Sequence, residues 1–255
     1  MLDIIATRNP GLVKAAVELH QQGAIPANSY VVDLDAVREN ARAIKRCVDR
    51  FDLRCFVMTK QFNRNQSMTA VLIEEGLDKF VAVDYEGASR LHGQGARVAH
   101  VGHLVQIPKS RVPEILGMEP EIWTVFSLDN AKFISDAAVH AGVTQDLLMK
   151  IVGPKDEAYT AQEGGIPFDH ALNVAQKIQQ LPNVRIVGVT GFFCTTYDFA
   201  SSQMLPTANL QTICEAAEML RSELGMEITY VNAPGSSSCQ SMELIAAHGA
   251  TDIEP

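Results

Sequence analysis

The 255-residue sequence lacks several features that would place it in a familiar class of protein. Its five cysteines are odd in number and form no Cys-X-X-Cys pair, so we expect reduced thiols rather than a disulfide framework. A formal net charge of −9 argues against binding to nucleic-acid phosphates. No segment approaches the ~20 apolar residues of a membrane span, and residues 1–20 carry Asp3 and Glu18 where a signal peptide would be apolar. These absences predict a cytoplasmic protein that binds neither nucleic acid nor membrane.

The hydrophobic pattern alternates between strand-like and helix-like segments. Apolar residues make up 47% of the chain, enough for a substantial core. The first predicted elements are an amphipathic helix at about 10–22, a short strand at 29–35 and a helix at 36–50 with Asp35 as its N-cap. Eight strands follow, near 54–60, 79–84, 98–103, 121–127, 146–152, 185–191, 227–232 and 251–254. Helical patterns separate them, at 66–76, 86–95, 108–117, 129–142, 168–181, 207–224 and 241–249.

Eight strands that alternate with helices predict an α/β fold, a (β/α)8 barrel of the TIM type with a parallel sheet. A doubly wound sheet would give a similar alternation, so the count favours the barrel without proving it. The predicted eighth strand ends at Pro255 with no helix after it. We therefore expect a truncated protein, with an N-terminal helix and strand in 1–35 and the barrel in 36–255.

Lys60 is a lone cation at the end of the apolar segment 54–60. The carboxyl ends of barrel strands are where such enzymes keep their active sites. A desolvated lysine there forms Schiff bases with carbonyl compounds, pyridoxal phosphate (PLP) among them. The alternative is a lysine that extends from the strand end into solvent.

A second candidate is the loop before the last predicted helix, which contains Asn232, Gly235, Ser236, Ser237 and Ser238. Glycine and serines before a helix N-terminus expose N–H groups and hydroxyls that suit a phosphate. Barrels often bind phosphate at the loops after strands seven and eight. A serine-rich helix cap would give the same pattern.

Two more charged residues lie on predicted strands. Glu254 ends strand eight, where a carboxylate facing a pyridinium nitrogen would keep that nitrogen protonated; an exposed acid before a turn is the alternative. Lys150 interrupts the apolar strand five, on the same side as Leu148 and Val152. An apolar helical layer would leave Lys150 unpaired, so we expect it to point into the barrel.

Other candidates are weaker. The segment 93–98 begins like a dinucleotide-binding motif but lacks its third glycine and precedes a strand. His100 and His103 are three apart on a predicted strand, so they should lie on opposite faces and share no metal, and metal ligands are not predicted. For His103 a hydrogen-bonded structural role is favoured over one in the cleft. Cys194 has no evident catalytic partner and is expected to be a buried structural residue.

Together these segments resemble the alanine-racemase-like, fold-type III PLP enzymes, over roughly residues 28–255. Val32 to Asn40 is similar to the family's opening Asp-Leu-Asp-Ala-Leu-Arg-x-Asn segment, and 57–60 takes the place of its Schiff-base lysine strand. The other matching pieces are 81–88, the loop 232–238 and 253–255. Within the family, the sequences of segments 58–62, 102–108 and 232–234 are most similar to a YhfX-type branch.

The resemblance implies roles for individual residues. Lys60 would bind PLP, and Arg64 stands where the family has a phosphate-binding tyrosine, so it would be the phosphate ligand here. Phe192 replaces a histidine that stacks on the pyridine ring, and Lys150 matches a lysine near the phenolic oxygen. Glu254 replaces the arginine of racemases, as in the decarboxylase branch. It favours decarboxylation, retro-aldol cleavage or elimination over racemisation.

The resulting hypothesis is the barrel of a PLP-dependent enzyme that acts on a small amino acid. Its second acid–base group is expected in a C-terminal β domain that this chain lacks, often across a homodimer. One alternative is a non-catalytic PLP-binding homeostasis protein, against which the strand predicted at 29–35 argues. The other is a phosphate-binding barrel without a Schiff base, in which Lys60 is a surface residue.

Overall fold

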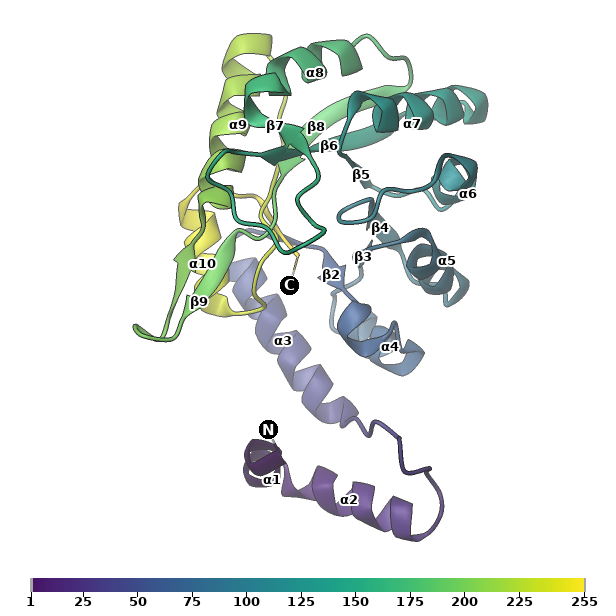
Figure 1. The fold of residues 1–255 in the computed structure, drawn as a ribbon. Coiled ribbons are helices and arrows are strands. Elements are labelled where there is room, and N and C mark those ends of the chain that lie inside the picture. The colour runs from purple at the N-terminus through teal and green to yellow at the C-terminus, as the bar shows by residue number, and fades with distance from the viewer. Residues whose placement is uncertain (1, 255) are drawn as a thin grey trace.

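Parallel strands form a nearly closed barrel in the computed structural model, which describes residues 2–254 (Figure 1). Pro255, the last residue of the predicted barrel, lies outside the described residues. In order around the barrel, the strands are β1 (Arg54–Cys55), β12 (Asp252–Ile253), β11 (Tyr230–Asn232), β8 (Val184–Thr190), β6 (Gln145–Val152), β5 (Ile122–Val125), β4 (Val98–Val101), β3 (Phe80–Ala82) and β2 (Val57–Met58). Only Phe56 separates β1 from β2, so this segment pairs with the last strand on one side and with β3 on the other. The predicted (β/α)8 barrel is confirmed.

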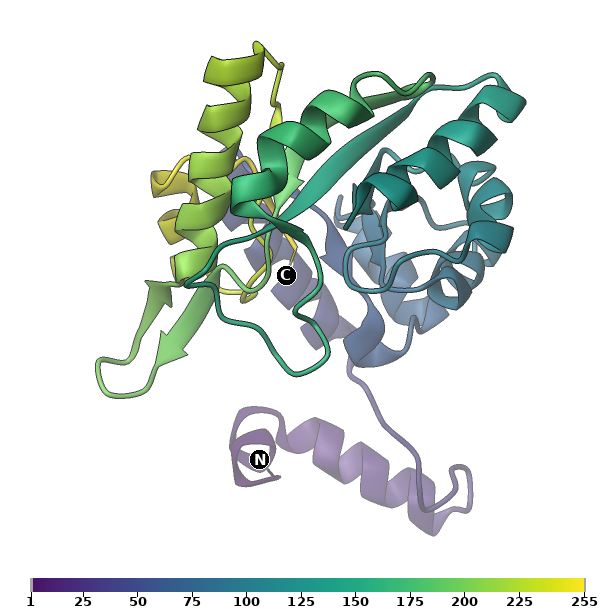
Figure 2. The same cartoon turned by 45° about the horizontal axis from the view of Figure 1, so that its top comes forward.

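Helices surround the strands on the outside of the barrel (Figure 2). They are α3 (Leu34–Arg50), α4 (Gln66–Glu74), α5 (Tyr85–Gly93), α6 (Val112–Leu116), α7 (Leu128–Ala141), α8 (Ala171–Ile178), α9 (Ala208–Leu224) and α10 (Cys239–Ala247), with short 3-10 turns at Lys109–Arg111 and Phe168–His170. Because strand side chains alternate between two faces, the core has two parts. One part packs strands against helices; the smaller part fills the barrel and consists of Phe56, Met58, Val81, Ala99, Ile122, Leu148 and Val187.

The N-terminal segment differs from the prediction. Helices α1 (Leu2–Arg8), which was not predicted, and α2 (Pro10–Gln21) lie apart from the barrel (Figure 1). The strand predicted at 29–35 is wrong, because residues 29–33 are irregular and pair with no strand among residues 2–254. The prediction of Asp35 as N-cap is also wrong, since Asp33 accepts hydrogen bonds from the first turn of α3. Because residues 29–33 form no strand, they do not count against the PLP-binding homeostasis alternative.

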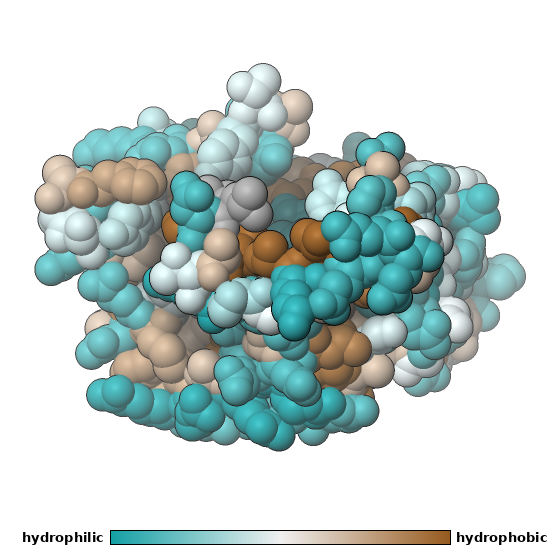
Figure 3. Space-filling model, turned by 90° about the horizontal axis from the view of Figure 1, so that it is seen from below, coloured by the Kyte–Doolittle hydropathy of each residue, from teal (hydrophilic) through white to brown (hydrophobic). Residues whose placement is uncertain are grey.

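Apolar side chains of the N-terminal helices remain on the surface. Ile4 and Val17 are each at least half exposed, and no residue of α2 is buried. Figure 3 views the molecule from the side of these helices, where apolar atoms reach the surface between hydrophilic ones. None of the described helices is long and apolar enough to cross a membrane.

Three small elements at the carboxyl ends of the strands were not predicted. Strands β9 (Thr195–Asp198) and β10 (Gln203–Pro206) form an antiparallel hairpin after β8, and β7 (Ile166–Pro167) pairs with the end of β6. A 3-10 turn, Lys60–Phe62, follows β2. These elements are short and partly exposed, and so carry little hydrophobic periodicity.

Closure of the barrel also changes the cysteine assignment. The first and last strands are neighbours, so α3 and α10 lie against each other. Cys47 on α3 and Cys239 on α10 are joined by a disulfide, with their Cα atoms 5.6 Å apart. The expectation of reduced thiols throughout is wrong for this pair, whereas Cys55, Cys194 and Cys214 are free.

Candidate active site

Six candidate residues lie at or just beyond the carboxyl ends of six different strands. Lys60 follows β2, His103 follows β4, Lys150 lies near the end of β6, Phe192 follows β8, Asn232 ends β11 and Glu254 follows β12. Because all these strands are parallel, their carboxyl ends open on one mouth of the barrel.

Lys60 lies two residues beyond the strand rather than on it. It begins the 3-10 turn and is exposed. The turn is closed by hydrogen bonds from Asn63 N to Lys60 O (3.1 Å) and from Arg64 N to Thr59 O (3.0 Å). The positive charge of Lys60 makes a small contribution to lowering the pKa of His103.

Glu254 is buried and makes its contacts with two histidines. His100 Nδ1 is hydrogen-bonded to Glu254 Oε1, and His103 Nδ1 lies 3.3 Å from Glu254 Oε2. The other nitrogen of His100, Nε2, is 2.7 Å from Thr124 Oγ1. All of these side chains are almost completely buried. The three ionisable side chains offer ligand atoms within 4.8 Å of one another, the kind of grouping that also occurs at metal sites.

The prediction that His100 and His103 lie on opposite faces is wrong. Strand β4 ends at Val101, so the two-residue alternation does not extend to His103. Gly102 turns the chain with a φ of +78°. A Cβ at this position would lie 2.5 Å from Thr124 O, so the turn needs glycine.

Burial and proximity leave both Glu254 and His103 deprotonated at neutral pH, the first charged and the second neutral. Burial alone would raise the pKa of Glu254, but proximity to His103 and His100 outweighs it, and the pKa lies below its usual value. Burial lowers the pKa of His103 to about 4, although the nearby Glu254 charge opposes the shift. At neutral pH the site therefore contains an ionised carboxylate beside a neutral imidazole.

Several buried polar atoms at this end of the barrel have no hydrogen-bond partner within residues 2–254. They are Glu254 Oε2, both ring nitrogens of His103, Asn232 Nδ2 and Thr59 Oγ1. The other side-chain atom of Asn232, Oδ1, accepts a 2.7 Å hydrogen bond from Thr190 Oγ1. An unpaired buried polar group costs roughly 1–3 kcal/mol, so this grouping indicates a site for a polar ligand.

The loop 232–238 leads into the N-terminus of α10. Ser238 is the N-cap of this helix, because its Oγ accepts a hydrogen bond from Ser241 N (3.0 Å). Gly235 lies so close to Thr195 Oγ1 that a Cβ would collide with it, and Ser236 N donates to the same oxygen (3.3 Å). Ser237 is exposed. Helix N-termini of this kind favour anions.

Lys150 is buried on the same face of β6 as Leu148, which belongs to the cluster inside the barrel. Its Nζ donates to Gln162 O (2.9 Å) and lies 4.6 Å from the centre of the Phe126 ring. Burial lowers the pKa of Lys150 to about 8, with the charge of Glu163 opposing the shift. Lys150 is thus a second amine near the mouth. At neutral pH a fraction of it is unprotonated and therefore nucleophilic.

Arg64 and Phe192 differ in how they relate to the site. Arg64 lies 3.4 Å from Asp84 and packs on Gly87, where a Cβ would be 2.5 Å from its Nη2. Arg64 Nε is buried and has no hydrogen-bond partner within residues 2–254, and the predicted phosphate role of Arg64 stays a prediction. Phe192 is partly buried and meets the His103 ring edge-on at 5.7 Å.

Cys194 is fully buried, and burial raises its pKa well above the usual value, so a nucleophilic thiolate is not formed there. The sequence does not single out Thr124 or Thr195, which hold His100 and the loop at Gly235. The only signal for Thr124 is a polar residue inside the apolar strand β5.

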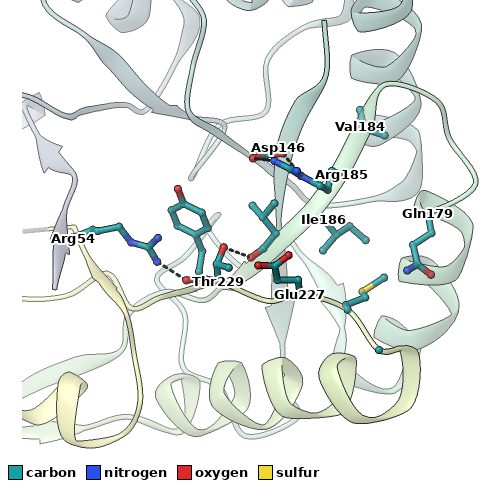
Figure 4. Close-up of a pocket in the computed structure, with 12 residues that line it drawn as sticks. Arg54, Asp146, Gln179, Val184, Arg185, Ile186, Glu227 and Thr229 are labelled. Atoms are coloured by element: carbon teal, nitrogen blue, oxygen red, sulfur yellow. Dashed lines mark hydrogen bonds and ion pairs between the residues drawn. The ribbon is translucent and has the colours of Figure 1, made fainter. Parts of the chain in front are cut away.

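A cavity of about 630 Å³, whose lining residues Figure 4 shows, lies at the other end of the barrel from these residues. It is lined by the amino ends of strands, and two of its charged groups are paired, Arg54 with Asp252 and Arg185 with Asp146. Barrel enzymes keep their chemistry at the carboxyl ends, so this cavity is not the candidate site.

Comparison with known proteins identifies the family of this barrel. The family described as alanine racemase, N-terminal domain, matches residues 32–252. The uncharacterized protein YhfX of Escherichia coli (strain K12) is 37% identical over 254 residues, covering 100% of this chain. Our chain spans 65% of the length of that relative.

Two solved structures share the fold. Diaminopimelate decarboxylase from M. jannaschii has a TM-score of 0.73 at 13% identity, over 92% of this chain and 62% of that one. D-threonine aldolase from Filomicrobium marinum has a TM-score of 0.67 at 15% identity, over 91% and 61%. The fold and the family match thus define an alanine-racemase-like barrel of fold type III. The chain belongs to the alanine racemase N-terminal domain family.

Proposed function

We propose that this chain is the cofactor-binding barrel of a PLP-dependent enzyme that acts on an amino acid. The observation that carries the proposal is Glu254, a buried, ionised carboxylate at the end of the last strand, whose Oε2 has no hydrogen-bond partner in the described part of the chain. A carboxylate in this state accepts a hydrogen bond from a protonated pyridine nitrogen.

The remaining groups at the mouth fit the same cofactor. Lys60 offers an amine for covalent attachment, and the loop 232–238 offers the N-terminus of α10 to a phosphate. Phe192 offers an apolar ring face beside His103, and Asn232 offers a buried amide group close to Glu254. When bound, PLP supplies an electron sink for charge that develops on the substrate Cα.

Glu254 favours reactions that need the full electron sink over simple racemisation. An ionised carboxylate keeps a ring nitrogen protonated, because separating the pair in a buried site would leave an uncompensated charge. Decarboxylation, retro-aldol cleavage and elimination are therefore proposed ahead of racemisation. The names of the two structural neighbours, a decarboxylase and an aldolase, are consistent with this order.

Labelling with PLP and borohydride, followed by peptide mass spectrometry, tests the proposal. We expect the pyridoxyl group on Lys60 and its loss in Lys60→Ala. Lys150→Ala is the matched control, because Lys150 is the other amine near the mouth and its pKa is about 8. Label on Lys150 would refute Lys60 as the attachment site, and label scattered over surface lysines would favour a phosphate-binding barrel without a covalent cofactor.

A further inference from the structure

A buried chain of hydrogen bonds lies behind Glu254. Thr124 Oγ1 is 2.7 Å from His100 Nε2, and His100 Nδ1 is hydrogen-bonded to Glu254 Oε1. Thr124 and His100 have no exposed surface, and Glu254 is 3% exposed. These residues come from β5, β4 and the segment after β12, so the chain of bonds spans the inside of the barrel.

The ionised carboxylate fixes the direction of its bond with His100. An ionised Glu254 can only accept, so His100 Nδ1 must carry the hydrogen that it donates. The Thr124 hydroxyl can donate or accept, and it pairs with Nε2 on the other side of the ring. Thr124 thereby orients the imidazole toward Glu254.

The same bonds fix which carboxylate oxygen remains available. Oε1 is engaged by His100, whereas Oε2 has no hydrogen-bond partner in residues 2–254. His103 Nδ1 lies 3.3 Å from Oε2 but does not hydrogen-bond to it. A hydrogen bond to the charged form favours that form, so His100 helps to keep Glu254 ionised while leaving Oε2 open.

We propose that His100, oriented by Thr124, is a positioning residue that holds Glu254 ionised with Oε2 presented to the ring nitrogen of the cofactor. The inference rests on the proposed function, and it adds a residue to the site rather than a reaction. It predicts that the protonation of the bound ring depends on a histidine that does not itself touch the cofactor.

The test uses PLP labelled with nitrogen-15 in its ring, bound to the whole chain and observed by NMR. The ring resonance of the wild type should lie at the protonated position. His100→Leu removes the donor and should move the resonance toward the unprotonated position, with PLP affinity falling roughly ten-fold. His100→Asn retains an amide donor near the position of Nδ1. It should return the ring resonance most of the way to the protonated position and restore most of the PLP affinity.

Thr124→Val is a second, nearly isosteric variant that removes only the hydroxyl. It should move the ring resonance in the same direction as His100→Leu, and it keeps the test decisive if that variant does not fold, as judged by circular dichroism. An unchanged resonance in a folded Thr124→Val or His100→Leu protein would overturn the inference.

Borohydride labelling of the same samples separates the two proposals. If Lys60 is labelled and the ring resonance is unchanged in the variants, the role of His100 is refuted and the proposed function stands. Loss of label from the wild type would refute the proposed function, and the inference with it.

Discussion

His103 Nδ1 lies 3.3 Å from Glu254 Oε2, although one residue follows β4 and the other follows the last strand of the barrel. Both side chains are buried, and neither atom has a hydrogen-bond partner within the described chain. An imidazole and a carboxylate in this relationship hold the site ready for a ligand that supplies the missing partners. The geometry depends on the turn at Gly102.

Gly102→Ala should therefore damage both stability and cofactor binding. The residue has a φ of +78°, and a Cβ would lie 2.5 Å from Thr124 O, a backbone atom that cannot move away cheaply. Gly142→Ala is the matched control, because Gly142 also has a positive φ, +68°, but its Cβ would meet nothing within 4 Å. Urea denaturation should show a loss of about 1–2 kcal/mol for the control and a clearly larger loss for Gly102→Ala.

Equal losses for the two glycine variants would contradict the close approach to Thr124. A Gly102→Ala protein that binds PLP as tightly as the wild type would likewise show that the turn does not position His103.

His103 should make stability depend on pH in the acid range. Its pKa falls from 6.5 in the unfolded chain to about 4 in the folded protein, so between these values the unfolded state binds more protons. Stability should fall as the pH drops from about 6.5 to 4, by at most about 3 kcal/mol from this residue. Glu254, whose pKa is lowered on folding, contributes in the same direction at lower pH.

His103→Gln removes the imidazole and isolates its contribution. The difference between wild type and variant in the free energy of unfolding, measured by urea titration from pH 4.5 to 7.5, should shrink or change sign as the pH falls. Parallel pH profiles for the two proteins would mean that His103 titrates normally in the folded state.

The regular part of this fold could be predicted from the sequence, but the irregular part could not. Strands such as β6 and β8 are apolar runs between amphipathic helices, and their order along the chain fixes the barrel. The pattern at 29–35 is also strand-like, but a strand exists only with a partner, and the described chain provides none. The hydrophobic pattern of a segment does not show whether another strand is available to pair with it.

The candidate site shows the same limit. Lys60 and Glu254 follow apolar strands, so their end of the barrel was predictable, whereas the approach of His100 and His103 depends on one turn at Gly102. That turn breaks the strand alternation on which the prediction relied. Likewise, the contact of Arg64 with Asp84 joins the turn after β2 to the start of α5, a pairing that the sequence alone does not indicate.

Arg54 should stabilise the amino end of the barrel by pairing with a buried acid. Burial raises the pKa of Asp252 to about 6, and the Arg54 charge opposes that shift. Arg54→Met leaves this carboxylate unpaired and should cost about 3–5 kcal/mol. The loss should be larger at pH 8 than at pH 5, because the folded state can protonate Asp252 below about pH 6.

Arg185→Met is the matched control for Arg54→Met. The side chain of Arg185 is 68% exposed in its ion pair with Asp146, so its removal should cost no more than about 1 kcal/mol. Similar losses for the two arginine variants in thermal or urea denaturation would contradict the buried character of the Arg54–Asp252 pair.

The Cys47–Cys239 disulfide should be detectable by thiol counting and should contribute to stability. Alkylation of the denatured, unreduced protein should block Cys55, Cys194 and Cys214, and two further thiols should react after reduction.

Because the bridge joins residues 192 apart in sequence, Cys47→Ser should lower the free energy of unfolding by about 2–5 kcal/mol under non-reducing conditions. Reduced wild type and Cys47→Ser should then unfold alike. Cys214→Ser, which removes a free thiol, is the matched control and should leave the response to reductant unchanged. Five reactive thiols before reduction would show that α3 and α10 pack together without a covalent link.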